Sequence, residues 1–158
     1  MEIADYLLET AGLDWEALLA PWQDELPPEF QLWLVNRFAE PFIVDPGGKV
    51  TLLRLDDGKL EPLADSRDAF LNVVDDHVED WFLAPLVSRM AEAGAVLAPG
   101  RCFGFIHPPI MGGAYDVSNV QVVALDQYYR FTHNVFEQTR HLPDGTHVRL
   151  LPRRTKVR

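Results

Sequence analysis

Apolar residues recur at helical spacing over the first part of the chain. In residues 3–11 this spacing predicts a helix that ends near Gly12. Asp14 follows directly, and its side chain can cap a short second helix that reaches Leu19. The chain therefore begins with two predicted helices.

A third helix is predicted over residues 29–38. Pro28 suits the first turn of a helix, because proline lacks the amide that would otherwise go unbonded there. The apolar residues Phe30, Trp33, Leu34 and Phe38 would then share one face.

The pattern changes to short apolar and alternating runs beyond residue 40. Residues 41–45 and 50–55 predict a β-hairpin around the turn at 46–48. Asp57-Gly58 predicts a second turn into residues 59–63, where Pro62 favours an edge strand. Together these segments predict a three-stranded antiparallel meander.

Helices and strands alternate in the rest of the sequence. The expected elements are a helix capped by Ser66 that contains Phe70, Val73, Val74, His77 and Val78; a helix from about 80 to Gly94, with a break or new start at Pro85; strands near 101–105 and 120–124; and a helix capped by Asp126 that ends at Pro143-Asp144-Gly145. No linker or internal repeat divides the chain. We therefore expect a single α+β domain over residues 1–158, with an antiparallel sheet packed against several helices.

Charge is unevenly distributed along the sequence. The formal net charge is −10, but residues 1–92 hold 20 acidic and 6 basic side chains, a net of −14. Five of the basic residues that follow lie in a tail at 149–158: Arg149, Arg153, Arg154, Lys156 and Arg158. An acidic body repels nucleic acid and anionic lipid and attracts basic proteins, although acidity also serves solubility alone.

Location and cofactor chemistry are constrained by what the sequence lacks. It has no signal-peptide pattern and no apolar run near the roughly 18 residues of a membrane span, so the cytoplasm is expected. Cys102 is the one cysteine, which excludes a disulfide framework and a cysteine-built zinc site. No phosphate-binding, dinucleotide-binding, metalloprotease or nucleophile-elbow motif is present. We expect no catalytic residue, no metal and no cofactor.

Histidines and glycines supply the remaining candidates for chemistry. His107, His133, His141 and His147 lack the spacing of metal ligands, so surface or hydrogen-bonded roles are favoured. A small metal-dependent hydrolase that uses His107, Asp116 or His133 remains an alternative. Gly112-Gly113 lacks the lysine or serine of a phosphate loop and predicts a tight turn.

Three groups of glycine, proline and apolar positions carry a family resemblance. They are residues 40–66, which include Gly48-Lys49-Val50; residues 97–113, which include Pro99-Gly100-Arg101-Cys102-Phe103-Gly104-Phe105 and Pro108-Pro109-Ile110-Met111-Gly112-Gly113; and Leu142-Pro143-Asp144-Gly145. This combination resembles a bacterial family of type VI secretion immunity proteins, whose members often carry a GAD-like N-terminal segment. Met111 stands where that family usually has leucine, a conservative exchange in volume.

The resemblance covers residues 28–148, and leaves the N-terminal helices (1–27) and the basic tail (149–158) outside it. It implies an α+β fold, no enzymatic activity, and neutralisation of a cognate toxin. A toxin that degrades nucleic acid needs basic residues to bind phosphates, so the acidic charge of this chain makes a nuclease a candidate toxin. The resemblance supplies no functional residues. A general protein-binding or regulatory module of the same family, without a toxin partner, is the second interpretation.

One acidic segment is the candidate for contact with a basic partner. On a helix, Asp75, Asp76, Glu79 and Asp80 would share a face, which is typical of a solvated or partner-facing stripe and lacks the pattern of a calcium loop. Trp81 is the candidate aromatic anchor, with packing in the core as its alternative. The oligomeric state is left open.

Overall fold

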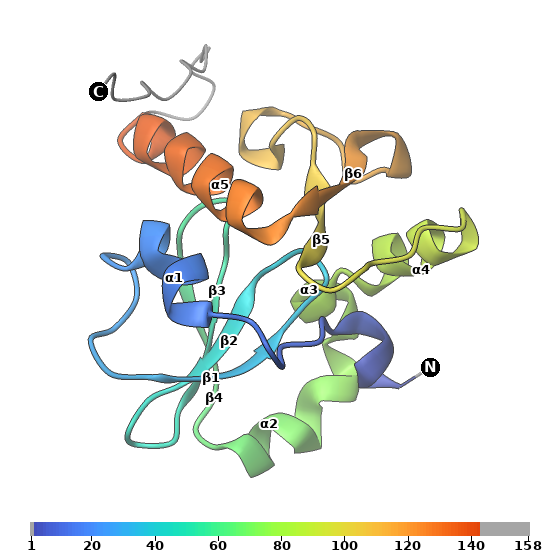
Figure 1. Ribbon diagram of the computed structural model, residues 1–158. Coiled ribbons are helices and arrows are strands. Elements are labelled where there is room, and N and C mark those ends of the chain that lie inside the picture. Colours follow the sequence, from blue (N-terminus) through green and yellow to red (C-terminus); the bar gives the residue numbers. More distant parts are fainter. Residues whose placement is uncertain (1, 143–158) are drawn as a thin grey trace.

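The computed structural model describes residues 2–142 of the chain (Figure 1). In chain order the elements are η1 (Ile3–Tyr6), α1 (Trp15–Leu19), η2 (Ala20–Trp22), β1 (Gln31–Val35), β2 (Pro41–Val44), β3 (Val50–Leu53), β4 (Leu60–Ala64), α2 (Arg67–Val73), η3 (Val74–Asp76), α3 (Val78–Phe82), α4 (Ala84–Glu92), β5 (Arg101–Phe105), η4 (Pro109–Met111), η5 (Val117–Asn119), β6 (Val120–Ala124) and α5 (Leu125–Thr139), where η denotes a 3-10 helix. This mixture of antiparallel strands and separate helices confirms the α+β class.

Two antiparallel sheets form the strand layer. The larger sheet is a meander in the order β1-β2-β3-β4, and the smaller one is the β5-β6 pair. Phe42 faces Leu52 across β2 and β3, while Cys102 faces Val123 across the smaller sheet. The two sheets are joined through the backbone, since the amide of Phe103 donates to the carbonyl of Arg37 at 2.7 Å.

The central strands of the larger sheet are buried on both faces. Successive side chains of a strand point to opposite sides, and here Phe42 and Leu52 enter one hydrophobic cluster while Ile43 and Leu53 enter another. This double burial explains why β2 and β3 are nearly continuous apolar runs.

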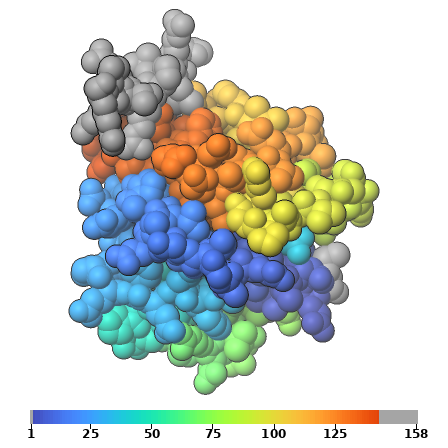
Figure 2. Space-filling view, in the orientation of Figure 1, coloured from blue at the N-terminus to red at the C-terminus, as the bar shows by residue number. Residues whose placement is uncertain are grey.

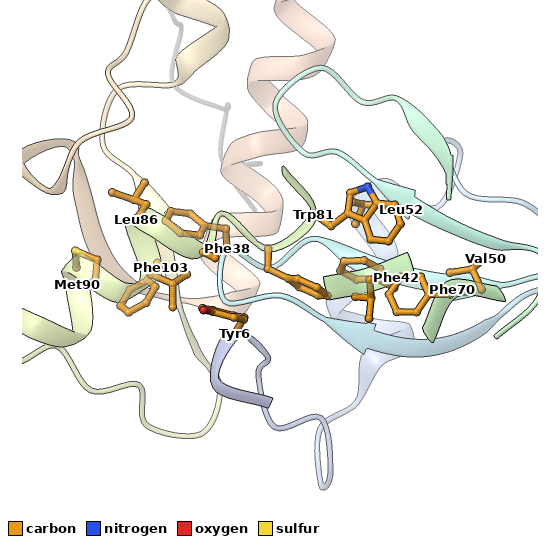
Figure 3. Close-up of a cluster of buried hydrophobic side chains, with 14 of the residues drawn as sticks. Tyr6, Phe38, Phe42, Val50, Leu52, Phe70, Trp81, Leu86, Met90 and Phe103 are labelled. Atoms are coloured by element: carbon orange, nitrogen blue, oxygen red, sulfur yellow. The ribbon is translucent and has the colours of Figure 1, made fainter. Parts of the chain in front are cut away.

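Each face of the sheet is covered by its own helices. On one side Phe70 of α2 and Trp81 of α3 pack beside Phe42 (Figure 3). On the other side Trp22 of η2 packs against Phe136 of α5. Figure 2 shows the N-terminal segment against α5 on this second side.

Several local predictions are confirmed at the level of single hydrogen bonds. Asp14 caps α1 by accepting from the amide of Ala17 at 3.2 Å. Ser66 caps α2 in the same way, accepting from the amide of Ala69 at 3.0 Å. The predicted meander is also present, with Pro62 in the last strand of the sheet.

The helix predicted over residues 29–38 is wrong, because that segment forms β1 and a turn. Residues 31–35 are apolar at almost every position, so they fit a strand as well as a helix. β2 is buried at every position, so the backbone N–H and C=O groups along its edge need hydrogen-bond partners. Residues 31–35 supply these partners by pairing with β2 as a strand. This non-local requirement decides the conformation.

The helix predicted over residues 3–11 shortens to the single turn of η1. Beyond Tyr6 the chain runs alongside the end of β1, where the amide of Leu8 donates to the carbonyl of Val35 at 2.9 Å. Leu7 also forms an isolated bridge with Asn36. Pairing with this edge replaces the helical hydrogen bonds.

Two helix boundaries also differ from the prediction. The helix expected from Ser66 to Val78 is broken at His77, between η3 and α3. Asp126 is not the N-cap of α5; Ala124 takes that position, and Asp126 lies in the first turn, where it pairs with Arg130 at 3.3 Å. The helix end expected at residues 143–145 and the basic tail lie outside the described residues.

Candidate functional site

The acidic segment 75–80 lies on the surface, across the junction of η3 and α3. The side chains of Asp75, Asp76, Glu79 and Asp80 are all exposed, as the amphipathic pattern predicted. Within residues 2–142, Asp75, Asp76 and Glu79 take part in no ion pair, whereas Asp80 pairs with Arg54. Three carboxylates of the segment are therefore free to meet an incoming cation.

Trp81 packs in the core, which was the alternative to its role as an aromatic anchor for a partner. The residue is only 5% exposed and stacks on Phe70, with ring centroids 5.3 Å apart. The exposed imidazole of His77 stacks on the same indole at 4.2 Å. In this conformation Trp81 supports the acidic segment from below, and its ring presents little area to a partner.

Arg54 connects this segment to the sheet. Its Nη2 donates to the carboxylate of Asp80 at 2.8 Å and to the backbone carbonyl of the same residue at 2.9 Å. Its Nε donates to Glu61 at 2.9 Å, and its Nη1 to Glu40 at 3.2 Å. The planar guanidinium thus holds three carboxylates from three different parts of the chain.

Glu40 is the buried member of this group. One carboxylate oxygen accepts from the amide of Leu55 at 3.1 Å, and the other from the side chain of Asn36 at 3.1 Å as well as from Arg54. Burial raises the pKa of Glu40 above its usual value, and Arg54 and these hydrogen bonds act in the opposite direction. The charge of Glu40 is therefore compatible with its position only while these partners are present.

Asn36 links the same network to α3. Its side-chain amide donates to the carbonyl of Trp81 at 3.1 Å, and its side-chain oxygen accepts from the amides of Phe38 and Glu40 at 3.1 and 3.0 Å. Buried polar groups with all their partners specify one arrangement of the elements that they join. Asn36, Glu40 and Arg54 were not predicted as a group, although Glu40 and Arg54 are charged residues next to apolar runs, which is a signal visible in the sequence.

A cleft of about 580 Å³ opens beside this network. Its apolar lining includes Phe105 of β5, Leu83 after α3 and Phe131 of α5. Leu83 adopts a left-handed backbone conformation with φ of +52°. Such a conformation costs a non-glycine residue about 1–2 kcal/mol, and strain of this kind concentrates at functional positions.

Carboxylates dominate the polar lining of the cleft. The lining includes six acidic side chains (Glu40, Asp56, Asp57, Glu61, Glu79 and Asp80) and two basic ones (Arg54 and Lys59). Asp56 accepts from the amide of Ile110 at 2.9 Å, which ties the loop after β5 to the cleft. Burial raises the pKa of Asp56, and the neighbouring charge of Asp57 raises it further.

The histidines serve local structure. His107 contacts the carbonyl of Met111 through Nε2 at 3.0 Å, and His133 contacts Glu25 through Nε2 at 3.0 Å. Asp116 caps η5 by accepting from the amide of Ser118 at 3.1 Å. None of these residues lines the cleft, and within residues 2–142 none of their hydrogen bonds joins one of them to another. His141 is exposed, and His147 lies outside the described residues.

The glycine pair forms a tight turn, as predicted. Gly112 has a φ of +93° at the end of η4, and a Cβ on Gly113 would lie 1.8 Å from the backbone oxygen of His107. Only glycine allows the loop to close this tightly.

Neither a metal site nor a membrane span is found within residues 2–142. No group of three or more His, Cys, Asp or Glu side chains in this range is arranged to hold a metal ion. None of the helices in the same range has the length and apolar character required to cross a bilayer.

Part of this structure matches a known protein family. Residues 64–135 match the family model described as T6SS immunity protein Tdi1, C-terminal. This match confirms the resemblance predicted from the sequence over a stretch that runs from the end of β4 into α5 and includes the acidic segment. Residues 28–63 and 136–148 of the predicted coverage lie outside it. No curated protein matches the chain.

Proposed function

Because residues 64–135 match the C-terminal region of type VI secretion immunity proteins, we propose that this chain binds and neutralises a cognate toxin. It acts by occupying a surface of the toxin and catalyses no reaction itself. Neutralisation takes place in the cytoplasm of the producing cell, where a toxin delivered by neighbours would act. The family match is the observation that carries the proposal, and the exposed carboxylates of Asp75, Asp76 and Glu79, which form no ion pair within residues 2–142, lie inside the matched region.

The charge of these residues favours a basic partner. An acidic surface raises the association rate with a basic protein and disfavours nucleic acid and anionic membranes. A toxin that degrades nucleic acid needs basic residues to bind phosphates, so a nuclease fits this surface. A few anchor residues would supply most of the affinity, as they do at protein interfaces in general.

The experiment is a charge reversal with a matched control. One variant carries Asp75→Lys, Asp76→Lys and Glu79→Lys; Asp80 is left unchanged because it pairs with Arg54. The control reverses three other exposed carboxylates, Glu9, Glu16 and Glu92, so both variants have the same net charge. The partner is the toxin encoded beside this gene, and association rates are measured at low and high salt.

We expect the first variant to associate about tenfold more slowly than the control at low salt, and the difference to shrink at high salt. The first variant should also protect cells that express the toxin less well than the control does. Equal rates for the two variants at low salt would contradict the acidic segment as the contact surface. Failure of the unaltered protein to bind any neighbouring toxin would instead favour a binding module without a toxin partner.

A further inference from the structure

The cleft beside the acidic segment has the size and lining of a binding site. Its volume of about 580 Å³ lies within the ~300–1,000 Å³ that is typical of ligand sites. Phe105 and Tyr128 are buried in its apolar floor, and Phe131 is half-buried beside them. Tyr115 also lines the cleft and is 56% exposed, with its ring packed edge-on against Phe105 at 5.3 Å. An apolar side chain that enters the cleft therefore meets several aromatic rings.

The mouth of the cleft is negatively charged. The carboxylates of Asp57, Glu61 and Asp80 keep 38%, 39% and 66% of their side-chain surface exposed, and Glu79 is exposed as well. All three nitrogens of Arg54 already donate to Glu40, Glu61 or Asp80. The guanidinium therefore has few donors left to bind an anion, whereas the carboxylates around it can accept further hydrogen bonds from a cation.

We propose that this cleft receives a large apolar side chain, aromatic by preference, from a protein segment in which lysine or arginine flanks that side chain. The apolar group packs among Phe105, Tyr115 and Phe131, while its basic neighbours pair with Glu79 and with the carboxylates across the mouth. The assignment of this segment to the toxin rests on the proposed function. The preference of the cleft for an apolar side chain with basic neighbours does not depend on that function.

A short peptide tests the cleft without the toxin. The probe is a capped peptide of sequence Gly-Lys-Trp-Arg-Gly, titrated into the full-length 15N-labelled protein and followed by the shifts of backbone amides. Two peptides serve as controls: Gly-Glu-Trp-Glu-Gly reverses the charge, and Gly-Lys-Gly-Arg-Gly removes the ring. We expect saturable shifts at cleft residues for the first peptide alone, with a dissociation constant of about 1 mM.

Matched variants locate the two parts of the interaction. Glu79→Lys places a cation at the mouth and should weaken binding of the peptide about fivefold. Glu92→Lys makes the same change of charge at an exposed position that does not line the cleft, and it should alter binding less than about twofold because salt screens exposed charges that do not contact the ligand. Tyr115→Ala should also weaken binding, whereas Val122→Ala, at an exposed apolar position of β6 outside the cleft, should not.

Three outcomes would overturn the proposal. The first is the absence of saturable shifts at cleft residues, and the second is equal binding of the acidic peptide. The third is occupation of the cleft by the protein itself. A second copy in the cleft would be seen as shifts of cleft amides on dilution without peptide. The chain's own basic tail in the cleft would be seen as shifts of the same amides when the five basic residues of 149–158 are replaced by glutamine. A toxin that binds the intact protein while the peptide fails would leave the proposed function standing and remove the cleft from it.

Discussion

The guanidinium of Arg54 lies 3.2 Å from the carboxylate of Glu40, and both side chains are largely withdrawn from solvent. Glu40 immediately precedes β2 and Arg54 immediately follows β3, so antiparallel pairing brings these two chain positions together. The same guanidinium reaches Asp80 at 2.8 Å. The ion pair thus connects the sheet to the acidic segment that we propose as a contact surface.

Removal of Arg54 should destabilise the protein in a pH-dependent way. Arg54→Met leaves Glu40 buried without its cation, a change that typically costs ~3–5 kcal/mol. Burial raises the pKa of Glu40, and loss of Arg54 raises it further. A carboxyl group whose pKa is higher in the folded protein stabilises fully below its unfolded pKa, and this stability is lost as pH rises through the folded pKa.

The destabilisation by Arg54→Met should therefore be larger at about pH 8 than at about pH 5, as measured by urea unfolding. Lys59→Met is the matched control, because the side chain of Lys59 is 78% exposed and should contribute less than about 0.5 kcal/mol. Equal losses for Arg54→Met at both pH values would show that the charge of Glu40 is not responsible.

Gly58 should tolerate no side chain, because α5 packs directly on it. A Cβ at this position would lie 2.2 Å from the ring of Phe136, and Gly58 has a φ of +72°. Gly58→Ala should cost ~2–4 kcal/mol from overpacking and backbone strain together. Gly12→Ala is the control: Gly12 has a φ of +78° but no atom within 4 Å of a Cβ, so strain alone should cost ~1–2 kcal/mol. Similar losses of thermal stability for both variants would contradict the packing explanation.

The hydroxyl of Tyr129 should stabilise the backbone at Ala39. It donates to the carbonyl of Ala39 at 2.7 Å, within the core, and Ala39 has a φ of +67°. Tyr129→Phe leaves that carbonyl without its donor and should cost ~1–3 kcal/mol in chemical denaturation. Tyr115→Phe removes a hydroxyl from an exposed side chain and should change the free energy of unfolding by less than ~0.5 kcal/mol. A Tyr129→Phe variant as stable as the unaltered protein would refute this role.

Cys102 should be unreactive in the folded protein. The side chain is fully buried, and burial raises the pKa of its thiol to about 12, so little thiolate forms near neutral pH. An aromatic disulfide reagent should therefore label the protein only after unfolding in urea. A variant that carries Ala98→Cys, at an exposed position, should gain one thiol that reacts in the folded state. Rapid labelling of Cys102 without denaturant would contradict its burial.

Local features of the sequence were reliable where the chemistry is local. Asp14 and Ser66 cap their helices as predicted, because a capping side chain bonds an amide only three residues away. The hairpin of β2 and β3 follows in the same way from its turn and flanking apolar runs. The exposure of Asp75, Asp76 and Glu79 was predictable from their charge alone.

The conformation of residues 31–35 could not be predicted from their local pattern. Their apolar run suits a helix or a strand, and pairing with β2 selects the strand. Trp81 is a similar case, since an aromatic residue beside acidic ones can anchor a partner or fill the core. Its stacking on Phe70 depends on how α2 and α3 meet, which no nearby residue determines.

Sequence patterns were enough to predict the α+β class, the meander, two helix caps, the acidic character of the first 92 residues and the family resemblance. All of these depend on residue type and short spacing. The grouping of Glu40, Arg54 and Asp80, and the cleft with an acidic mouth beside them, depend on how the whole chain folds. Glu40 and Asp80 are forty positions apart, and their proximity arises from strand pairing and from the packing of helices on the sheet. Contacts of this kind follow from the fold as a whole, because they form only when the entire core is buried.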